Sequence, residues 1–254
     1  MKILLTNDDS HDSPLFLIAI ELLKAYGDVT IVVPAEEQSW KGKAMTRYGP
    51  LYVERIDLHG TPAFSVTGTP ADCVNLAVYS LMDSKPDLVV SGVNLGINTG
   101  LGFLLASGTL GACFEGNIAG IPGLALSQEI TFDDHKQWDA ERSFRADTVA
   151  EMRDVIERSL PDIWQQLVLE QPVRPTTWSV NLPRQLQSEG VVRCRLGETF
   201  YQRCFARRGD QYFHQLARFD TDTESDTDWA VLHTGRVSAA YIDLSVLGQI
   251  GDHQ

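Results

Sequence analysis

The sequence predicts an α/β fold in which a mostly parallel sheet is flanked by helices. Strand-like and helix-like segments alternate through the first half of the 254 residues, as they do in βαβ units. Several strand-like segments are unbroken apolar runs, which is typical of strands buried on both faces by covering helices. With 43% hydrophobic residues, the chain is long enough for one large domain, or for one domain with an appended subdomain.

The amino-terminal elements follow from apolar spacing and from residues that end helices. The apolar run after Lys2 predicts the first strand, which stops at the adjacent carboxylates of Asp8 and Asp9. Positions 14–25 carry apolar residues at helical spacing, and Gly27 supplies a C-terminal stop. A second buried strand is expected at 28–34 (DVTIVVP), followed by shorter strands at 51–56 and 63–66.

The later elements are expected in this order: a helix at 70–82, a strand at 86–91, a loop rich in glycine and asparagine, a helix at 107–118 and a strand at 124–127. A long amphipathic helix with alternating charge is expected from 138 to about 160. The segment 177–182 predicts another strand. The acidic stretch 220–228 (DTDTESDTD) is expected to be an exposed loop, because such a stretch cannot be buried.

The amino-acid composition of the chain indicates which partners and which cellular compartment to expect. The formal net charge of -13 argues against binding of a nucleic-acid duplex, since that affinity comes mainly from clustered Lys and Arg. The four cysteines are widely scattered and are expected to be reduced thiols. The amino terminus lacks the pattern of a secretory leader, and no run of 18 apolar residues occurs. We therefore expect a cytoplasmic protein with no membrane partner.

Polar residues follow the first two predicted strands. Asp8 and Asp9 repel each other when both are ionised, and a hard divalent cation is the simplest compensation. A turn in which one aspartate caps the next helix explains the pair equally well. After the second strand, Ser39 offers a hydroxyl oxygen that can bind a metal or form a hydrogen bond. Because ligands bind beyond the carboxyl ends of parallel strands, these side chains are candidates for one site.

Two further segments supply amides, hydroxyls and a helix terminus. Asn94 and Asn98 lie in a loop with glycine at alternate positions, which either lets backbone approach a ligand or is simply a turn. Ser107, Gly108 and Thr109 begin a predicted helix, whose positive end can bind an anion, although close helix packing also favours small residues. Carboxylates for a cation beside a helix end for an anion together suggest metal-assisted phosphoryl chemistry.

With these segments in order, the sequence resembles the SurE survival proteins, a family of metal-dependent 5'-nucleotidases and phosphatases. The resemblance rests on the following stretches: ILLTNDD at the start, VVPAEEQS ending at Ser39, GTPADCV at 68–74, SGVNLGINTG at 91–100, and SGT at 107–109 with its helix through Glu115 and Gly116. It extends more weakly to NLP at 181–183 and GRVS at 235–238, so it covers most of the chain.

The resemblance implies both a site and an architecture. It places one divalent cation, Mg²⁺ or Mn²⁺, on Asp8, Asp9, Ser39 and Asn94, and phosphate contacts on the following residues: Asn98, Ser107, Gly108 and Thr109. It implies a single SurE-like domain over 1–254, with a Rossmann-like core at about 1–130. The remainder, about 131–254, would hold a covering helix, late strands, a β-hairpin and an oligomerisation extension of a homodimer or homotetramer. The apolar segment 237–250 suits such an interface, or a closing strand and helix of the same subunit.

The implied function is hydrolysis of nucleoside 5'-monophosphates or other small phosphate esters, with Asp8 and Asp9 as catalytic residues. Either a metal-bound water or one aspartate attacks phosphorus, and water is favoured because a carboxylate engaged by metal is a weakened nucleophile. Two loops depart from the family pattern, at 10–13 (SHDS) and 40–45 (WKGKAM). They motivate the alternative of a weakly active or inactive nucleotide-binding regulatory homologue. A Rossmann-type cofactor enzyme is disfavoured, since no G-x-G-x-x-G follows the first strand.

Overall fold

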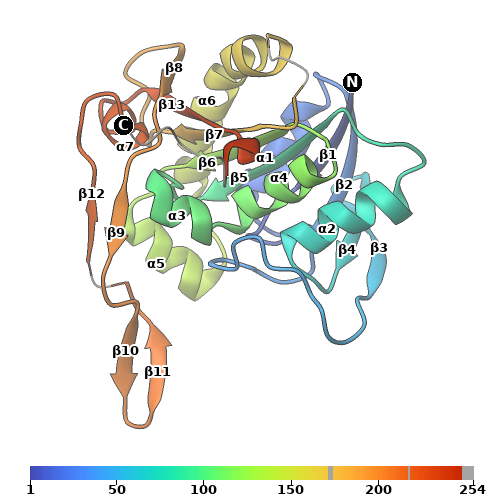
Figure 1. Cartoon of the computed structure of the whole chain (residues 1–254), viewed down its shortest axis with the longest axis horizontal. Helices are drawn as coiled ribbons and strands as arrows, with labels where there is room; N and C mark the ends of the chain where they lie inside the picture. The colour runs from blue at the N-terminus through green and yellow to red at the C-terminus, as the bar shows by residue number, and fades with distance from the viewer. Residues whose placement is uncertain (171–173, 217, 248–254) are drawn as a thin grey trace.

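A nine-stranded sheet with helices on both faces organises the described part of the protein (Figure 1). The computed structural model describes residues 1–170, 174–216 and 218–247. The strand order is β3-β4-β2-β1-β5-β6-β7-β13-β8. The six strands from β4 to β7 run parallel to one another, whereas β3 and β13 are antiparallel to their neighbours β4 and β7. The predicted α/β fold with a mostly parallel sheet is confirmed.

The strands of the main sheet have these bounds: β1 Lys2–Thr6, β2 Asp28–Pro34, β3 Val53–Leu58, β4 Thr61–Val66, β5 Leu88–Leu95, β6 Gly123–Gln128, β7 Thr177–Leu182, β8 Val191–Cys194 and β13 Val237–Ile242. Four short strands form two antiparallel pairs outside it: β9 Thr199–Tyr201 with β12 Phe219–Thr221, and β10 Phe205–Arg208 with β11 Gln211–His214. Strands β2 and β7 have the predicted bounds. Of the late apolar segment, 237–242 is strand β13, Leu244–Val246 is the short helix η3, and 248–250 lie outside the described residues.

The helices divide between the two faces of the sheet. Helices α2 (Pro70–Leu76) and α4 (Gly108–Ile118) pack together on one face, and α1 (Pro14–Leu23) and α6 (Ala146–Ile163) pack together on the other. The remaining helical segments are α3 (Gly100–Ala106), α5 (Phe132–Glu141), α7 (Asp228–His233), and the π-helical continuations η1 (Ala77–Leu81) and η2 (Trp164–Leu169). A capping box between Thr69 and Asp72, with Pro70 in the first turn, explains where α2 begins.

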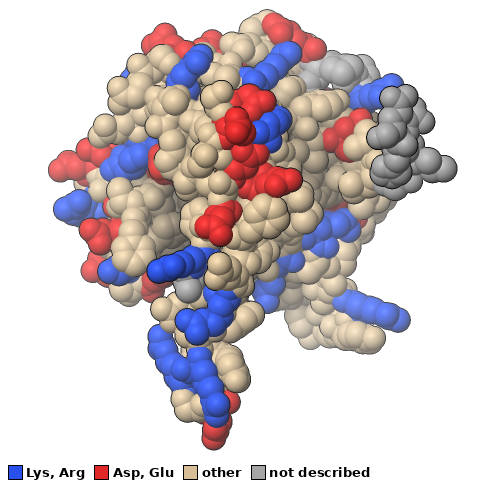
Figure 2. Space-filling view, turned by 60° about the vertical axis from the view of Figure 1, so that its left-hand side comes forward, with Lys and Arg blue, Asp and Glu red and all other residues tan. Residues whose placement is uncertain are grey.

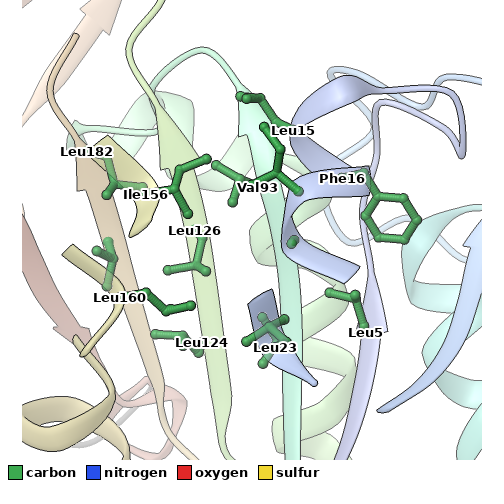
Figure 3. Close-up of a cluster of buried hydrophobic side chains, with 14 of the residues drawn as sticks. Leu5, Leu15, Phe16, Leu23, Val93, Leu124, Leu126, Ile156, Leu160 and Leu182 are labelled. Atoms are coloured by element: carbon green, nitrogen blue, oxygen red, sulfur yellow. The ribbon is translucent and has the colours of Figure 1, made fainter. Parts of the chain in front are cut away.

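The larger hydrophobic core lies between the sheet and helices α1 and α6 (Figure 3). Leu5 and Leu126 from the strands meet Phe16 of α1 and Leu160 of α6 in this layer, and all four side chains are buried. A second cluster fills the opposite face, beneath α2 and α4. Burial on both faces is why the strands have unbroken apolar sequences, and it holds their carboxyl ends in fixed relative positions.

The single long helix predicted from 138 to about 160 is wrong, because two helices occupy this region. Helix α5 ends at Arg142, which adopts a left-handed φ of 51°, and α6 starts after the extended Arg145. The rings of Trp138 and Phe144 stack with centroids 5.4 Å apart and pack the turn between the helices. Helical periodicity continues across such a turn, so spacing alone does not reveal the break.

Three other predictions need correction. Strand β5 continues to Leu95, past a β-bulge after Ser91. Residues 92–95, which the sequence analysis places in a loop, are therefore part of the strand. Glycine at 92 permits this pairing, since a Cβ there would lie 2.2 Å from the Leu126 carbonyl oxygen. Helix α3 occupies 100–106, where no helix was expected. The acidic stretch 220–228 is not wholly exposed, because Asp228 is fully buried at the start of α7.

The β10–β11 pair forms a narrow hairpin that projects from the body of the protein (Figure 1). Figure 2 shows basic side chains along this arm, to which Arg207 and Arg208 belong, with acidic side chains prominent on the body beside it. The antiparallel hairpin in the second half of the chain agrees with expectation. No helix within the described ranges has both the length and the apolarity needed to cross a membrane.

Candidate active site

The predicted site residues come together at the carboxyl ends of β1, β2 and β5, which are adjacent in the sheet. Asp8 and Asp9 follow β1, Ser39 lies in the loop after β2, and Asn94 lies near the end of β5. Asp8, Ser39 and Asn94 line a cavity of about 510 Å³, together with Asn98 and Ser107. The sheet order therefore unites four segments that are far apart in the sequence.

The two aspartates are a buried pair. Each is only 3% exposed. Asp9 Oδ2 accepts a hydrogen bond of 2.7 Å from the Leu95 amide, and its Oδ1 receives no hydrogen bond from any described residue. Burial raises the pKa of Asp8, and burial together with the neighbouring Asp8 charge raises the pKa of Asp9 well above its usual range. Two carboxyl groups in this setting favour either a proton or a cation between them.

The amino terminus of α4 faces the same pair. The Thr109 hydroxyl donates a 2.6 Å hydrogen bond to Asp8 Oδ1 and opposes the rise in the pKa of Asp8. Glycine is required at 108, because a Cβ there would lie 2.9 Å from Asp8 Oδ2. Ser107 caps the helix by accepting the Leu110 amide at 3.3 Å, and it lines the cavity. Thr109 contacts Asp8 and is not part of the cavity wall.

The side chains of Asn94 and Asn98 are held in place by hydrogen bonds that their Nδ2 groups donate. Asn94 Nδ2 donates to the Gly96 carbonyl oxygen at 2.7 Å, and no described residue donates to Asn94 Oδ1. Asn98 Nδ2 donates to Ser127 Oγ at 2.8 Å, and the Asn98 backbone amide donates to Asn181 Oδ1 at 2.8 Å. Asn181 belongs to the weaker NLP motif of the sequence analysis. These contacts fix the orientation of both side chains at the cavity.

Ser39 differs from the aspartates because its side chain is exposed. Its hydroxyl donates to Glu37 Oε1 at 2.8 Å, which leaves the oxygen lone pairs available. Within the described ranges, no three His, Cys, Asp or Glu side chains are grouped so that they could hold a metal ion. A cation here would therefore need the mixed set of two carboxylates, the Asn94 amide oxygen and the Ser39 hydroxyl. All of these are hard oxygen donors, and their chemistry fits Mg²⁺ or Mn²⁺.

Sequence reasoning missed an outer wall of the cavity. Helix α5 contributes Phe132, His135 and Asp139, the latter two one helical turn apart. Burial lowers the pKa of His135. Aromatic side chains from distant segments complete the wall: Trp40, Phe103, His214, Phe219 and Trp229. Trp40 lies 4.5 Å from His214 and 6.0 Å from Phe103 between ring centroids. The one signal in the sequence was Trp40 itself, within a loop that departs from the family pattern.

The two loops that depart from the family pattern have definite structures. Ser10 stands where the resemblance leads us to expect glycine, and it adopts a left-handed φ of 71°. Asn7 Nδ2 donates to the Ser10 carbonyl oxygen at 2.9 Å and supports this turn. In the second loop, Lys43 forms a 2.6 Å ion pair with the buried Glu115. This pairing anchors the loop to α4 and engages the charge of Lys43.

These features define an α/β protein whose oxygen donors and helix amino terminus converge at the carboxyl edge of a parallel sheet. The chain belongs to the SurE family, since the sequence-family model for survival protein SurE matches its residues 3–203. A 5'-nucleotidase SurE from Chloroflexus aggregans is 38% identical over 97% of this chain and 94% of its own length. The one from Thermofilum pendens is 34% identical over 96% and 91%, respectively. The crystal structure of the SurE protein from Aquifex aeolicus aligns with a TM-score of 0.68 and 27% identity, covering 98% of this chain and 95% of that chain.

Proposed function

We propose that this protein is a divalent-metal-dependent phosphomonoester hydrolase acting on nucleoside 5'-monophosphates, which makes it a 5'-nucleotidase. The observation that carries the proposal is the buried Asp8–Asp9 pair, in which Asp8 lines the cavity and accepts a hydrogen bond from Thr109 at the amino terminus of α4. The names of the similar proteins, 5'-nucleotidase SurE, support the same activity. A cation site beside an anion site suits phosphate-ester hydrolysis, since both stabilise negative charge on phosphoryl oxygens.

One Mg²⁺ or Mn²⁺ would be held by Asp8, Asp9, Ser39 and Asn94. When bound, such an ion neutralises negative charge on a phosphoryl oxygen and lowers the pKa of a coordinated water. The protein contributes a pair of carboxylates already held by neighbours, since Thr109 donates to Asp8 and the Leu95 amide donates to Asp9. Ligands held in this way lose little conformational entropy on binding.

The remaining phosphoryl oxygens would be bound around the start of α4. Ser107 and Asn98 line the cavity, and Gly108 and Thr109 follow Ser107 in the first turn of α4, whose amide groups and positive end would bind the phosphate. A water molecule is the proposed nucleophile, because a carboxylate that binds a cation is a weakened nucleophile. The stereochemistry at an isotopically chiral phosphorus tests this: a single attack by water inverts the configuration, whereas attack by a carboxylate followed by hydrolysis of the acyl phosphate retains it.

The aromatic side chains that line the cavity favour a substrate whose leaving group carries a planar ring. Trp40, Phe103 and Phe219 line the cavity beyond the phosphate region, and aromatic faces stack well on nucleobases. His135 and Asp139 bring polar atoms to the same wall. A nucleoside monophosphate uses all of these features, whereas a short alkyl phosphate leaves the aromatic surface unused.

The proposal includes assembly into a homodimer or homotetramer, in which the projecting β10–β11 hairpin contacts another subunit. Phe205 and Tyr212 on this hairpin are 56% and 66% exposed, which is a large apolar area for a free surface. Light scattering coupled to size-exclusion chromatography measures the subunit number directly. A monomer at micromolar concentration would contradict this part of the proposal.

The deciding experiment is phosphate release from nucleoside monophosphates and from an aryl phosphate, with Mg²⁺, Mn²⁺ or chelator, for the wild type and Asp9→Asn. We expect metal-dependent release that the substitution abolishes. The altered loops at 10–13 and 40–45 are what favours the second candidate, a nucleotide-binding regulatory protein without turnover. Tight binding of a nucleotide with no release under any metal would establish that alternative.

A further inference from the structure

A chain of polar contacts connects Ser39 to helix α5. The Ser39 hydroxyl donates to Glu37 Oε1 at 2.8 Å. The other carboxylate oxygen, Glu37 Oε2, accepts a very short charge-assisted hydrogen bond from Arg142 Nη1. One carboxylate thus bridges a hydroxyl and a guanidinium, with a separate oxygen for each partner.

Arg142 is itself fixed by several contacts. It ends α5 in a left-handed conformation with φ of 51°, and its guanidinium lies 4.1 Å from the centre of the buried Trp138 ring. Its Nη2 donates to the Asp9 carbonyl oxygen at 3.3 Å, and it pairs with Asp12 at 3.5 Å. Arg142 therefore joins the loop that follows β1 to the loop that contains Glu37. Surface ion pairs contribute little alone, but this one belongs to a network anchored on a buried ring.

The direction of the Ser39 hydrogen bond determines what its oxygen can do. Because the hydroxyl hydrogen is given to Glu37, the lone pairs of Ser39 Oγ are free to bind a cation. Arg142 meanwhile pairs with Glu37 and offsets the negative charge of this carboxylate. We infer that Glu37 and Arg142 are positioning residues that orient Ser39 toward the cation. This inference rests on the metal site of the proposed function.

The test is a double-mutant cycle. Its measured quantity is the affinity of the metal-free full chain for Mn²⁺, determined by electron paramagnetic resonance. Ser39→Ala is compared in the wild type and in the Glu37→Ala, Glu37→Gln and Arg142→Gln backgrounds. Comparison within each background cancels the effect of a changed net charge on Mn²⁺ affinity, so only the contribution of Ser39 remains.

We expect Ser39→Ala to weaken Mn²⁺ binding about threefold to tenfold in the wild type. In the Glu37→Ala and Arg142→Gln backgrounds the same substitution should change binding less than about twofold, since Ser39 is no longer oriented. Glutamine at 37 has one acceptor oxygen and a donating NH₂ group where Glu37 has two acceptor oxygens, so it cannot accept hydrogen bonds from both Ser39 and Arg142. In the Glu37→Gln background the Ser39→Ala effect should therefore also fall below about twofold.

Arg153→Gln is the matched control, because Arg153 pairs with Glu21 and Glu157 on α1 and α6, away from the cavity. The Ser39→Ala effect should be unchanged in it. An equal Ser39→Ala effect in every background would overturn the inference while leaving the metal site intact. Loss of Mn²⁺ binding in Asp9→Asn shows that the proposed site is the one measured. No Mn²⁺ binding by the wild type, or no effect of Ser39→Ala there, would overturn the assignment of Ser39 and the inference together.

Discussion

The Thr109 hydroxyl, at the start of α4, donates a 2.6 Å hydrogen bond to Asp8 Oδ1 at the end of the first strand. This contact couples the two halves of the proposed site, because the helix that would bind phosphate also holds a carboxylate that would bind the cation. It further favours the ionised form of Asp8, whose pKa burial raises. Both partners are buried, so no bulk water replaces the hydroxyl when it is removed.

Thr109→Val tests this coupling with almost no change in side-chain volume. Loss of a hydrogen bond to a charged group costs about 1.5–3 kcal/mol. We therefore expect kcat/KM for phosphate release to fall at least about tenfold. Thr109→Ser keeps the hydroxyl and should retain activity within about threefold. The measurement is kcat/KM at saturating Mn²⁺. Activity of Thr109→Val within about threefold of the wild type, with a larger loss in Thr109→Ser, would show that packing of the methyl group, and not the hydrogen bond, is what matters.

Asp9→Asn is expected to stabilise the metal-free protein while it abolishes activity. The folded pKa of Asp9 lies well above its unfolded value, so the ionised group costs folding free energy that grows as pH rises from the unfolded pKa and levels off above the folded pKa. Asparagine has no such cost and can still accept the Leu95 amide.

The expected result is a melting temperature in chelator that is higher for Asp9→Asn than for the wild type at pH 8. Each kcal/mol corresponds to about 2–4 °C for a chain of this size. The difference should shrink toward pH 4, and Mn²⁺ should raise the melting temperature of the wild type alone. A variant less stable than the metal-free wild type at pH 8 would contradict the electrostatic account.

Binding of Mn²⁺ should release protons. The raised pKa values of Asp8 and Asp9 mean that the metal-free pair holds protons at pH values where an exposed carboxyl is ionised. The cation must displace them, so affinity should tighten as pH rises, by up to about tenfold per pH unit for each proton displaced. Calorimetry in buffers of different ionisation enthalpy counts the protons directly. Affinity independent of pH between 5 and 8 would show that the pair is already ionised without metal.

Trp40→Ala should alter the choice of substrate. Because Trp40 lines the cavity and contacts Phe103, His214 and Tyr201, its loss removes stacking surface for a base, worth about 1–3 kcal/mol. We expect kcat/KM to fall roughly fivefold to a hundredfold for nucleoside monophosphates and to change little for glycerol phosphate. Tyr48→Ala is the control, since Tyr48 is 82% exposed and lies outside the cavity wall. Equal losses for both substrates would assign Trp40 a structural role.

Asp228→Ala should destabilise the support beneath the aromatic wall. Asp228 is fully buried and accepts hydrogen bonds from the amides of Gly100 at 2.7 Å and Gly197 at 3.0 Å. Two unpaired buried amides cost about 1–3 kcal/mol each, partly offset because a buried charge is removed. Urea unfolding should show a net loss of about 2 kcal/mol. Asp226→Ala, which removes an exposed ion pair with Arg195, should cost less than about 1 kcal/mol.

Local sequence determined the elements whose apolar period or end signals are unambiguous. The strand at 28–34 appears with the predicted bounds, because its last four residues are buried within the sheet and form a continuous apolar run, IVVP. Helix α2 begins at Pro70 as predicted, since Thr69 and Asp72 cap it through contacts between near neighbours in the chain. The positions of Asp8, Asp9, Ser39 and Asn94 at strand ends also follow from these elements, and strand order then brings them together.

Tertiary structure alone decided what depends on residues far apart in the chain. The break at Arg142 arises from packing against Trp138 and from ion pairs with the loops after β1 and β2, and periodicity carries no record of such contacts. Asp228 is buried inside an acidic stretch because Gly100 and Gly197 supply amides to it. The aromatic wall combines five segments for the same reason. Short-range propensity and period specify elements, whereas long-range hydrogen bonds and packing specify the cavity they enclose.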